Sequence, residues 1–332
     1  MATESDFGST DVQSLAGKFD WRDNIVIVAL LVLGLVFTMT SEFFLTVDNI
    51  VNILRQTAIV GTLGVGMTFA IISAEIDISI GGITAVSGMV AAMVMSPEYL
   101  GAQYPWFIGI AASIAVGTSL GLMNGVITVR FGIPSFLVTL GMLGVTTGLA
   151  LILTNTSPVR VSVPTFYTIF SGELFGLPVI VIWAALAIVV GHFVLSETRI
   201  GRHIYATGDS TEAARYTGVD TDRIKMMTLT VSGLTAGIAG LLLIARLNVA
   251  RPTMGDGLML PAIAAVILGG TSLFGGRGWI PGTVLGALLM STIDNGLVLN
   301  GFGSSYQELI RGAVIIIAVM FREQEGEGWI SE

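Results

Sequence analysis

Cysteine is absent from the 332 residues of this chain, and histidine occurs only twice. The absence of cysteine excludes disulfides, thiol nucleophiles and thiolate metal ligands together. The two histidines, His192 and His203, are eleven residues apart and have no carboxylate pair beside them. They lack the ligand set of a usual metal centre. We therefore expect no metal site and no cofactor in this chain.

Charged residues are also scarce. They make up 11% of the chain, against about 25% in soluble domains. Hydrophobic residues make up 53%, and the mean hydropathy is +0.85. The apolar runs approach the roughly 20 residues that a helix needs to cross the hydrocarbon, and the alternating strands of an outer-membrane barrel are missing. The composition predicts an all-α polytopic membrane protein, surrounded by membrane lipids and with no nucleic-acid partner.

Ten apolar segments are predicted to cross the membrane. They are residues 24–40, 57–72, 78–95, 105–129, 133–153, 174–195, 227–247, 258–273, 281–299 and 309–321. If the N-terminus is cytosolic, ten of the fifteen Lys and Arg residues fall on the cytosolic side, in agreement with the positive-inside rule. We expect a cytosolic tail over residues 1–23, a transmembrane domain over 24–321 and a cytosolic tail over 322–332. Both termini are then cytosolic.

Three of these segments, 57–72, 258–273 and 309–321, are shorter than a comfortable span. Short segments interrupted by glycine often mark a transport pathway, and the first two run into glycine-rich polar hairpins. For the first segment there is an alternative, because residues 47–56 carry apolar side chains at helical spacing and could extend the same helix. Both interpretations stay open.

Glycine is abundant, with 42 residues, and much of it recurs at four-residue spacing. Small residues at that spacing let helix backbones approach closely inside a membrane. We interpret these stripes as ordinary packing in a compact bundle. They comprise Gly117, Gly121 and Gly125, then Gly233 and Gly237, then Gly282 and Gly286.

A long polar segment, residues 196–226, separates two apolar segments and mixes basic with acidic side chains. Asp209 or Ser210 can cap a short helix that runs through Tyr216 and stops at Gly218. Such a helix exceeds what membrane topology requires, so we favour a surface that docks another protein over a loop whose cations only fix topology. The candidate docking residues are Asp209, Ser210, Glu212, Ala213, Ala214, Arg215 and Gly218.

Polar residues near membrane depth are the second set of candidates. Glu75 and Asp77 lie two apart at the end of a short apolar segment, and charges near hydrocarbon usually serve a pathway or a pairing. The alternative places them in headgroup water beside Arg130 or Arg277. The glycines of residues 268–278 favour a tight turn. The candidate pathway residues are Glu75, Asp77, Asn124, Phe136, Thr139, Asp294 and Asn295.

Lysine is nearly absent, and this absence bears on energy coupling. Neither Lys18 nor Lys225 sits in the G-x-x-x-x-G-K-[ST] loop that binds nucleotide phosphates. A transporter built on this chain takes its energy from another chain or from an ion gradient. An ion-coupled secondary transporter would use Glu75, Asp77 and Asp294. A membrane enzyme is a third hypothesis, but neither histidine has an orienting partner.

Several motifs occur in a fixed order along the chain. They are FLTVDNIVNILRQ at 44–56, EIDISIG at 75–81, Asn124-Gly125 followed by IPSFLVTLG at 133–141, Gly201-Arg202 with YATG at 205–208, EAARYTG at 212–218, IAAVILGGTS at 263–272 and GGRG at 275–278. From about Phe44 to Met320, this set resembles the permease subunits of ribose/xylose/autoinducer-type ABC importers, which take up carbohydrates.

The resemblance implies a transport subunit of the cytoplasmic (inner) membrane that is not itself an enzyme. It also implies a dimer with a second copy or a sister permease, two ATP-binding cassette subunits that bind ATP and Mg, and an extracytoplasmic substrate-binding protein. The helix within 210–218 would be the coupling helix that enters a groove of the ATPase. Electrostatic complementarity around Arg215 and Glu212 would help to fix its register.

One motif departs from the family pattern. Where many members carry Glu-Leu-Asp before the Ala-Ala-Val run, this chain has Met259-Leu260-Pro261, as in a subset that includes autoinducer-type permeases. Pentoses, hexoses, sugar alcohols and autoinducer-like furanoses therefore all stay open as cargo. A neutral polyhydroxylated solute suits a chain with few intramembrane charges, because it needs hydrogen bonds rather than a counter-ion.

Overall fold

The computed structural model describes residues 25–100 and 104–327, and their regular structure is almost entirely helical. The long and apolar helices are α1 (Ile25–Thr40), α2 (Val47–Ile72), α3 (Ile80–Met95), α5 (Trp106–Phe131), α6 (Ser135–Leu153), α8 (Val179–Glu197), α11 (Thr221–Leu247), α12 (Met259–Leu268), α13 (Ile280–Leu299) and α14 (Ser304–Glu327). The shorter elements are α4 (Pro97–Leu100), α7 (Pro164–Ser171), β1 (Glu173–Leu174), β2 (Leu177–Pro178), α9 (Arg199–Asp209) and α10 (Thr211–Tyr216).

Six of the helices, α2, α5, α6, α8, α11 and α13, are long and apolar enough to cross a membrane, and α1, α3 and α12 are shorter apolar helices. Together with α14, they coincide with the ten predicted segments. The prediction of an all-α polytopic membrane protein is confirmed. The predicted tail over residues 1–23 lies outside the described residues, as do residues 328–332 of the predicted C-terminal tail, and residues 322–327 of that tail are helical as part of α14.

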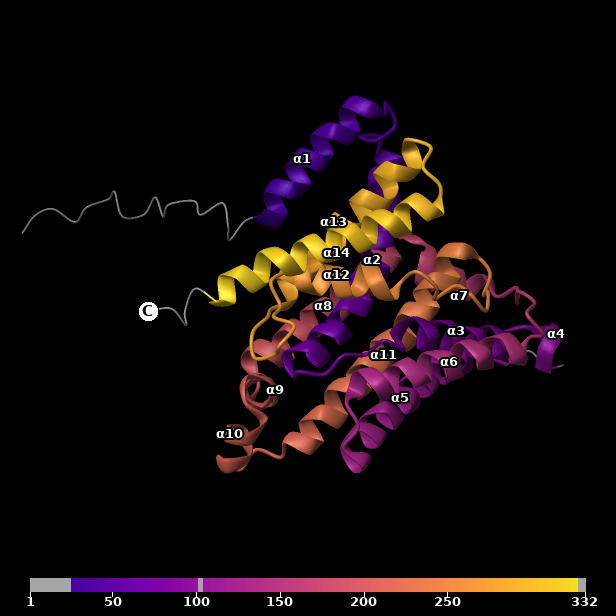
Figure 1. Ribbon diagram of the computed structural model, residues 1–332. Helices are drawn as coiled ribbons and strands as arrows, with labels where there is room; N and C mark the ends of the chain where they lie inside the picture. The colour runs from indigo at the N-terminus through magenta and orange to yellow at the C-terminus, as the bar shows by residue number, and fades with distance from the viewer. Residues whose placement is uncertain (1–24, 101–103, 328–332) are drawn as a thin grey trace, which may run out of the picture.

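By their burial, the long helices form an inner and an outer group, and Figure 1 shows α5 and α6 of the outer group along the lower right edge of the molecule. In the most apolar stretch of α2, α11 and α13, 67% to 72% of the residues are buried, but in α5, α6 and α8 only 22% are. A helix that is apolar all round is a buried one in a bundle or a membrane span. The second group therefore presents apolar side chains outward, where lipid or another subunit can cover them.

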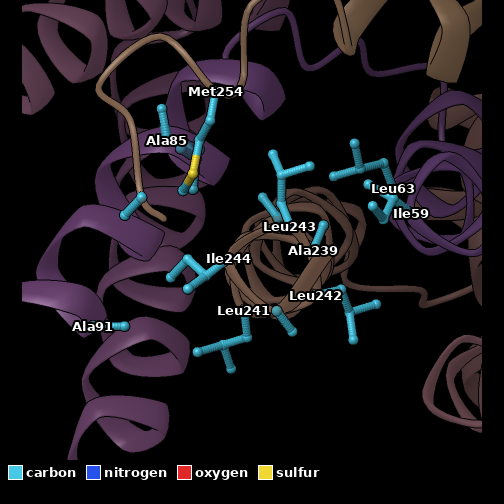
Figure 2. Close-up of a cluster of buried hydrophobic side chains, with 14 of the residues drawn as sticks. Ile59, Leu63, Ala85, Ala91, Ala239, Leu241, Leu242, Leu243, Ile244 and Met254 are labelled. Atoms are coloured by element: carbon cyan, nitrogen blue, oxygen red, sulfur yellow. The ribbon is translucent and has the colours of Figure 1, made fainter. Parts of the chain in front are cut away.

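Helix α11 lies at the centre of the largest apolar core, as Figure 2 shows. Its successive residues Leu241, Leu242, Leu243 and Ile244 point in different directions around the helix axis, and all four are buried. Helix α3 lies on one side of α11 and α2 lies on the other. These contacts fix α11 against both helices that flank residues 73–79.

The glycine stripes pack helices closely, as predicted. A methyl group on Gly121 of α5 would lie 2.9 Å from the Cα atom of Gly233 in α11, and one on Gly117 would lie 3.0 Å from the Cα atom of Gly237. Gly286 of α13 meets the backbone of Ala265 in α12 in the same way. Backbone thus packs on backbone at both pairs of helices, where larger side chains would hold them apart.

The structure decides between the two interpretations of the short segments. Helix α2 is continuous over 26 residues from Val47, so the segment 57–72 is the C-terminal part of a full-length helix. The segment 309–321 is likewise part of the longer α14. The shortness predicted for these two segments is wrong, because both helices continue through polar residues. Helix α2 contains Asn49 and Gln56, and α14 contains residues 304–308. Only α12, with ten residues, remains short.

Helix α7 and the β1–β2 hairpin are among the elements that were not predicted from the sequence. In helix α7, Phe166 stacks on Phe170 with ring centroids 5.0 Å apart, and Phe170 stacks on Trp183 of α8 at 5.4 Å. The strands β1 and β2 then form a hairpin in which Leu174 faces Leu177. The turn residues Phe175 and Gly176 both have positive φ, as a type I′ turn requires. The predicted segment 174–195 therefore begins with a hairpin, and its helix starts at Val179.

Candidate functional site

The polar segment 196–226 forms two consecutive helices and the start of a third. The predicted helix is present as α10, and the side chain of Ser210 caps it by accepting a hydrogen bond from the N–H of Ala213 at 3.2 Å. Gly218, at φ +89°, follows its end and adopts a conformation that favours glycine. Of the two proposed caps, Ser210 is the correct one, because Asp209 is the last residue of the preceding helix α9.

The exposed side of α10 presents a small side chain, that of Ala213, and one large aromatic ring, that of Tyr216. Ala214 is buried against the protein, whereas Glu212, Ala213 and Tyr216 are exposed, and Tyr216 has 84% of its surface accessible. Arg215 is also exposed, and its guanidinium donates to Thr221 at 2.7 Å and pairs with Asp222. Arg215 therefore fixes the turn between α10 and α11.

Helix α9 packs against the long apolar helices and connects them to α10. It was not predicted from the sequence. Its buried residues Gly201, Ile204 and Gly208 recur at helical spacing. Ile204 joins a core that includes Phe69 of α2 and Ile280 of α13. The spacing of these three residues is the signal that could have revealed α9. Because α9 is packed on several helices, α10 projects from a rigid base at one end of the molecule (Figure 1).

Residues 73–79 form a break between α2 and α3, and the first predicted acid, Glu75, lies in it. Glu75 is buried and forms an ion pair with Lys225 of α11 at 2.6 Å. Its neighbour Ser73 shares a hydrogen bond of 2.8 Å with Thr228. The alternative that the two acids lie in headgroup water beside Arg130 or Arg277 is therefore wrong. A charge in this setting needs a buried partner, and the chain supplies it.

Asp77 is the second acid of the break and has no exposed surface. It accepts hydrogen bonds from the N–H of Ser79 at 2.9 Å and from the hydroxyl of Ser232 in α11 at 2.7 Å. The amide of Asn124 in α5 donates to the Ser79 hydroxyl at 2.9 Å. The predicted residues Asp77 and Asn124 are thus brought together through Ser79, which the sequence did not single out.

Helix α6 closes the break from the other side. The hydroxyl of Ser135 accepts from the N–H of Ile76, and that of Thr139 accepts from the N–H of Ile78, each at 3.0 Å. Two backbone donors that no helix satisfies therefore find side-chain partners. Phe136, on the same helix, is 46% exposed. Thr139 supports the break, whereas Phe136 faces outward.

The remaining predicted pathway residues lie apart from this break, on α13. The Asp294 carboxylate binds both the Nε and an Nη of Arg311 in α14 at 2.8 Å and also accepts from Gln56 of α2 at 3.1 Å. Asn295 exchanges two amide hydrogen bonds with Asn49 of α2, at 2.9 and 2.8 Å. The candidates thus form two clusters, and both link α2 to other helices.

The glycine hairpin of residues 269–279 follows the short helix α12. Its backbone turns through residues of positive φ, among them Gly276, whose N–H donates to the carbonyl of Ile72 at the end of α2. The indole of Trp279 donates to the carbonyl of Gly269 at 3.0 Å and closes the hairpin. The predicted structural role is confirmed, since the hairpin caps the end of α2.

Six helices are long and apolar enough to cross a membrane, and buried charges pair with side chains of other helices, as is typical of a multi-pass membrane protein of the transport type. The chain belongs to the family described as branched-chain amino acid transport system / permease component, whose model matches residues 49–319. It is therefore a transport subunit of the inner membrane rather than an enzyme, as predicted.

Similar proteins carry names of sugar permeases. The chain is 38% identical over 298 residues to the ribose import permease protein RbsC of Escherichia coli (strain K12), which covers 89% of this chain and 91% of that protein. It is 36% identical to the D-allose transport system permease protein AlsC of the same strain, over 85% of each chain. It is 35% identical to the L-arabinose ABC transporter permease protein AraH of Azospirillum brasilense, over 90% of this chain and 87% of that protein. No solved structure matches the chain.

Proposed function

We propose that this chain is the transmembrane subunit of an ATP-driven ABC importer that conducts a sugar or a sugar-like polyhydroxylated solute. The observation that carries the proposal is the similarity to the ribose permease over 89% of the chain. The allose and arabinose permeases match over a comparable length, so the class of cargo, rather than one sugar, is what these relatives support. An ATP-binding cassette pair and an extracytoplasmic binding protein complete the importer.

The proposed topology has ten membrane crossings and both termini in the cytosol. An even number of crossings returns the chain to the side from which it started. Lys225 and the basic residues of α9 then lie on the cytosolic side, which agrees with the positive-inside rule. In this arrangement α10 and the break at residues 73–79 share the cytosolic end, and Asp294 with Arg311 lies toward the opposite end.

Helix α10 is the proposed contact with the ATP-binding subunit. A large exposed aromatic ring beside a small residue is typical of the anchors that dominate protein interfaces. Tyr216 and Ala213 provide such a pair on a short helix that Ser210 and Arg215 hold in place. The predicted docking residues thus divide into two kinds. Ala213 and Glu212 face the partner, whereas Ser210, Ala214, Arg215 and Gly218 maintain the shape of the helix, and Asp209 ends the preceding helix α9.

The predicted pathway residues divide in a similar way. Glu75, Asp77, Asn124, Thr139, Asp294 and Asn295 are buried inside one chain and bonded to neighbouring helices. We propose that they hold neighbouring helices in place beside the pathway instead of touching the solute. Phe136 is the exposed member of the set, and it is the residue that we place at the surface shared with the solute or with the second permease. The second permease is another copy or a sister chain.

Substitution of Tyr216 tests the docking role directly. The variant Tyr216→Ala removes an exposed ring, so the chain should fold normally while its affinity for the ATP-binding subunits falls by about thirtyfold, the size of a typical interface hot spot. The measurement is a titration of purified ATP-binding subunits onto the chain in nanodiscs. Phe175→Ala is the matched control, because Phe175 is 97% exposed in the β1–β2 turn and should have no effect. Equal affinities for all three chains would refute the docking role of α10.

A further inference from the structure

The end of α9 lies against two other pieces of backbone with no side chain between them. A methyl group on Gly208 would overlap the carbonyl oxygen of Ile72 and would lie 2.7 Å from the amide nitrogen of Gly276. A methyl group on Gly276 would lie 2.8 Å from the Cα atom of Asp209. Glycine at these two positions therefore allows three backbones to meet: α9, the end of α2, and the hairpin that joins α12 to α13.

Hydrogen bonds tie the same three segments. Gly276 donates its N–H to the carbonyl of Ile72 at 2.9 Å. The hydroxyl of Tyr205, one turn before the end of α9, donates to the carbonyl of Gly278 at 2.7 Å. Burial raises the pKa of Tyr205 above its usual value near 10. The phenol therefore keeps its proton, and its role as a donor, throughout the physiological pH range.

The beginning of α11, which follows α10, is attached to the residues at the end of α2 by two further contacts. Lys225, in the second turn of α11, forms the ion pair with Glu75, three residues after Ile72. The hydroxyls of Thr228 and Ser73 meet at 2.8 Å, one turn further along α11. Residues 72–75, at the end of α2, thus contact both α9, which precedes α10, and α11, which follows it.

We propose that Gly208, Gly276, Tyr205 and the Glu75–Lys225 pair form a joint that makes α10, the end of α2 and the α12–α13 hairpin move as one body. This inference rests on the proposed function, in which an ATP-binding subunit displaces α10. Closely packed elements transmit displacement because they are not continuously deformable. These residues touch neither ATP nor solute, so they are positioning residues for transport.

The joint is tested in the full importer, assembled in proteoliposomes from this chain, its ATP-binding subunits and its binding protein. Gly208→Ala and Gly276→Ala force the three backbones apart. We expect each variant to lower the solute imported per ATP hydrolysed by about tenfold, with the affinity for the ATP-binding subunits unchanged, because overpacking disturbs the joint and leaves α10 exposed. Tyr205→Phe, which removes one hydrogen bond and no volume, should lower the same ratio by a smaller factor.

Matched glycines provide the controls. Gly34, within α1, has no atom within 4 Å of a built methyl group and serves for Gly208. Gly301, at φ +80° and also in open space, serves for Gly276 and carries the same backbone strain. We expect Gly34→Ala and Gly301→Ala to transport with the wild-type ratio.

The outcomes separate the joint from the function on which it rests. Wild-type ratios in Gly208→Ala and Tyr205→Phe would overturn the joint while the importer stands. A loss of binding to the ATP-binding subunits, in step with the loss of transport, would also overturn it, since the variants would then have damaged α10 itself. A wild-type assembly that imports nothing with ATP would instead refute the proposed function.

Discussion

The pair Asp294 and Arg311 illustrates how single residues decide whether a buried charge is functional or structural. In the sequence, Asp294 is an acid inside an apolar segment, and a proton or sodium relay was one hypothesis for it. In the structure, Arg311 binds both carboxylate oxygens, and Gln56 adds a third hydrogen bond. A bidentate arginine holds a carboxylate in one geometry. The pair joins α14 to the inner helices.

Removing one partner of this pair should cost more than removing both. Arg311→Met leaves a buried carboxylate without a counter-ion, and we expect a loss of about 3–5 kcal/mol in the free energy of unfolding. The double variant Asp294→Asn with Arg311→Met should recover most of that loss, because no charge is left buried. Thermal unfolding of the four chains in detergent gives the double-mutant cycle. Additive losses would show that the two side chains do not depend on each other.

At the scale of elements, helix contacts follow the small residues. Gly117 and Gly121 of α5 lie on Gly233 and Gly237 of α11, so the two helices approach at backbone distance. Inside a membrane such close packing replaces the hydrophobic effect as the source of association. The α5–α11 contact also positions Asn124 of α5 and Ser232 of α11, which hold the break at residues 73–79.

A larger side chain in this stripe should separate the two helices. Gly121→Leu overpacks a backbone contact, and we expect it to lower the free energy of unfolding by about 1–3 kcal/mol. Gly148→Leu on α6 is the matched control, because a methyl group there meets no atom within 4 Å. Chemical unfolding of both variants in mixed micelles provides the comparison. Equal stabilities would mean that the stripe contributes nothing to packing.

The sequence predicts the elements well where apolar length alone decides them. All ten apolar segments coincide with helices, and Ser210 and Gly218 bound α10 as their side chains and backbone preferences indicate. The sequence fails where tertiary contacts decide. Asn49 and Gln56 argue against an apolar span, yet their hydrogen bonds to α13 place them inside α2. Likewise, nothing local to Lys225 shows that Glu75, far away along the chain, is its partner.

The candidate site divides along the same line. Sequence alone identified three acids that need a buried partner or a function, because charges are rare and costly near hydrocarbon. They are Glu75, Asp77 and Asp294, and all three are buried. Their partners come from other helices and depend on the fold: Lys225 for Glu75, Ser232 for Asp77 and Arg311 for Asp294. The ion-coupled hypothesis gave these acids the role of carrying ions, whereas each is bonded to another side chain within the chain.

At the scale of the whole molecule, the chain combines a bundle of long apolar helices with the short exposed helix α10. The inner helices α2, α11 and α13 are buried by the others, and α9 ties α10 to the end of α2 and to the hairpin after α12. Family membership makes the chain a permease component. In the proposed importer it contributes the pathway and the docking helix α10, while the ATP-binding subunits supply the energy and the binding protein delivers the solute.

The most direct test of the central claim is solute uptake into proteoliposomes that contain this chain, with the energy source varied. With the ATP-binding subunits and a binding protein loaded with radiolabelled ribose, allose or arabinose, we predict uptake of at least one sugar that requires ATP hydrolysis and stops with a non-hydrolysable analogue. The chain alone should import none of them under a proton or sodium gradient. Gradient-driven uptake by the chain alone, without ATP, would contradict the account.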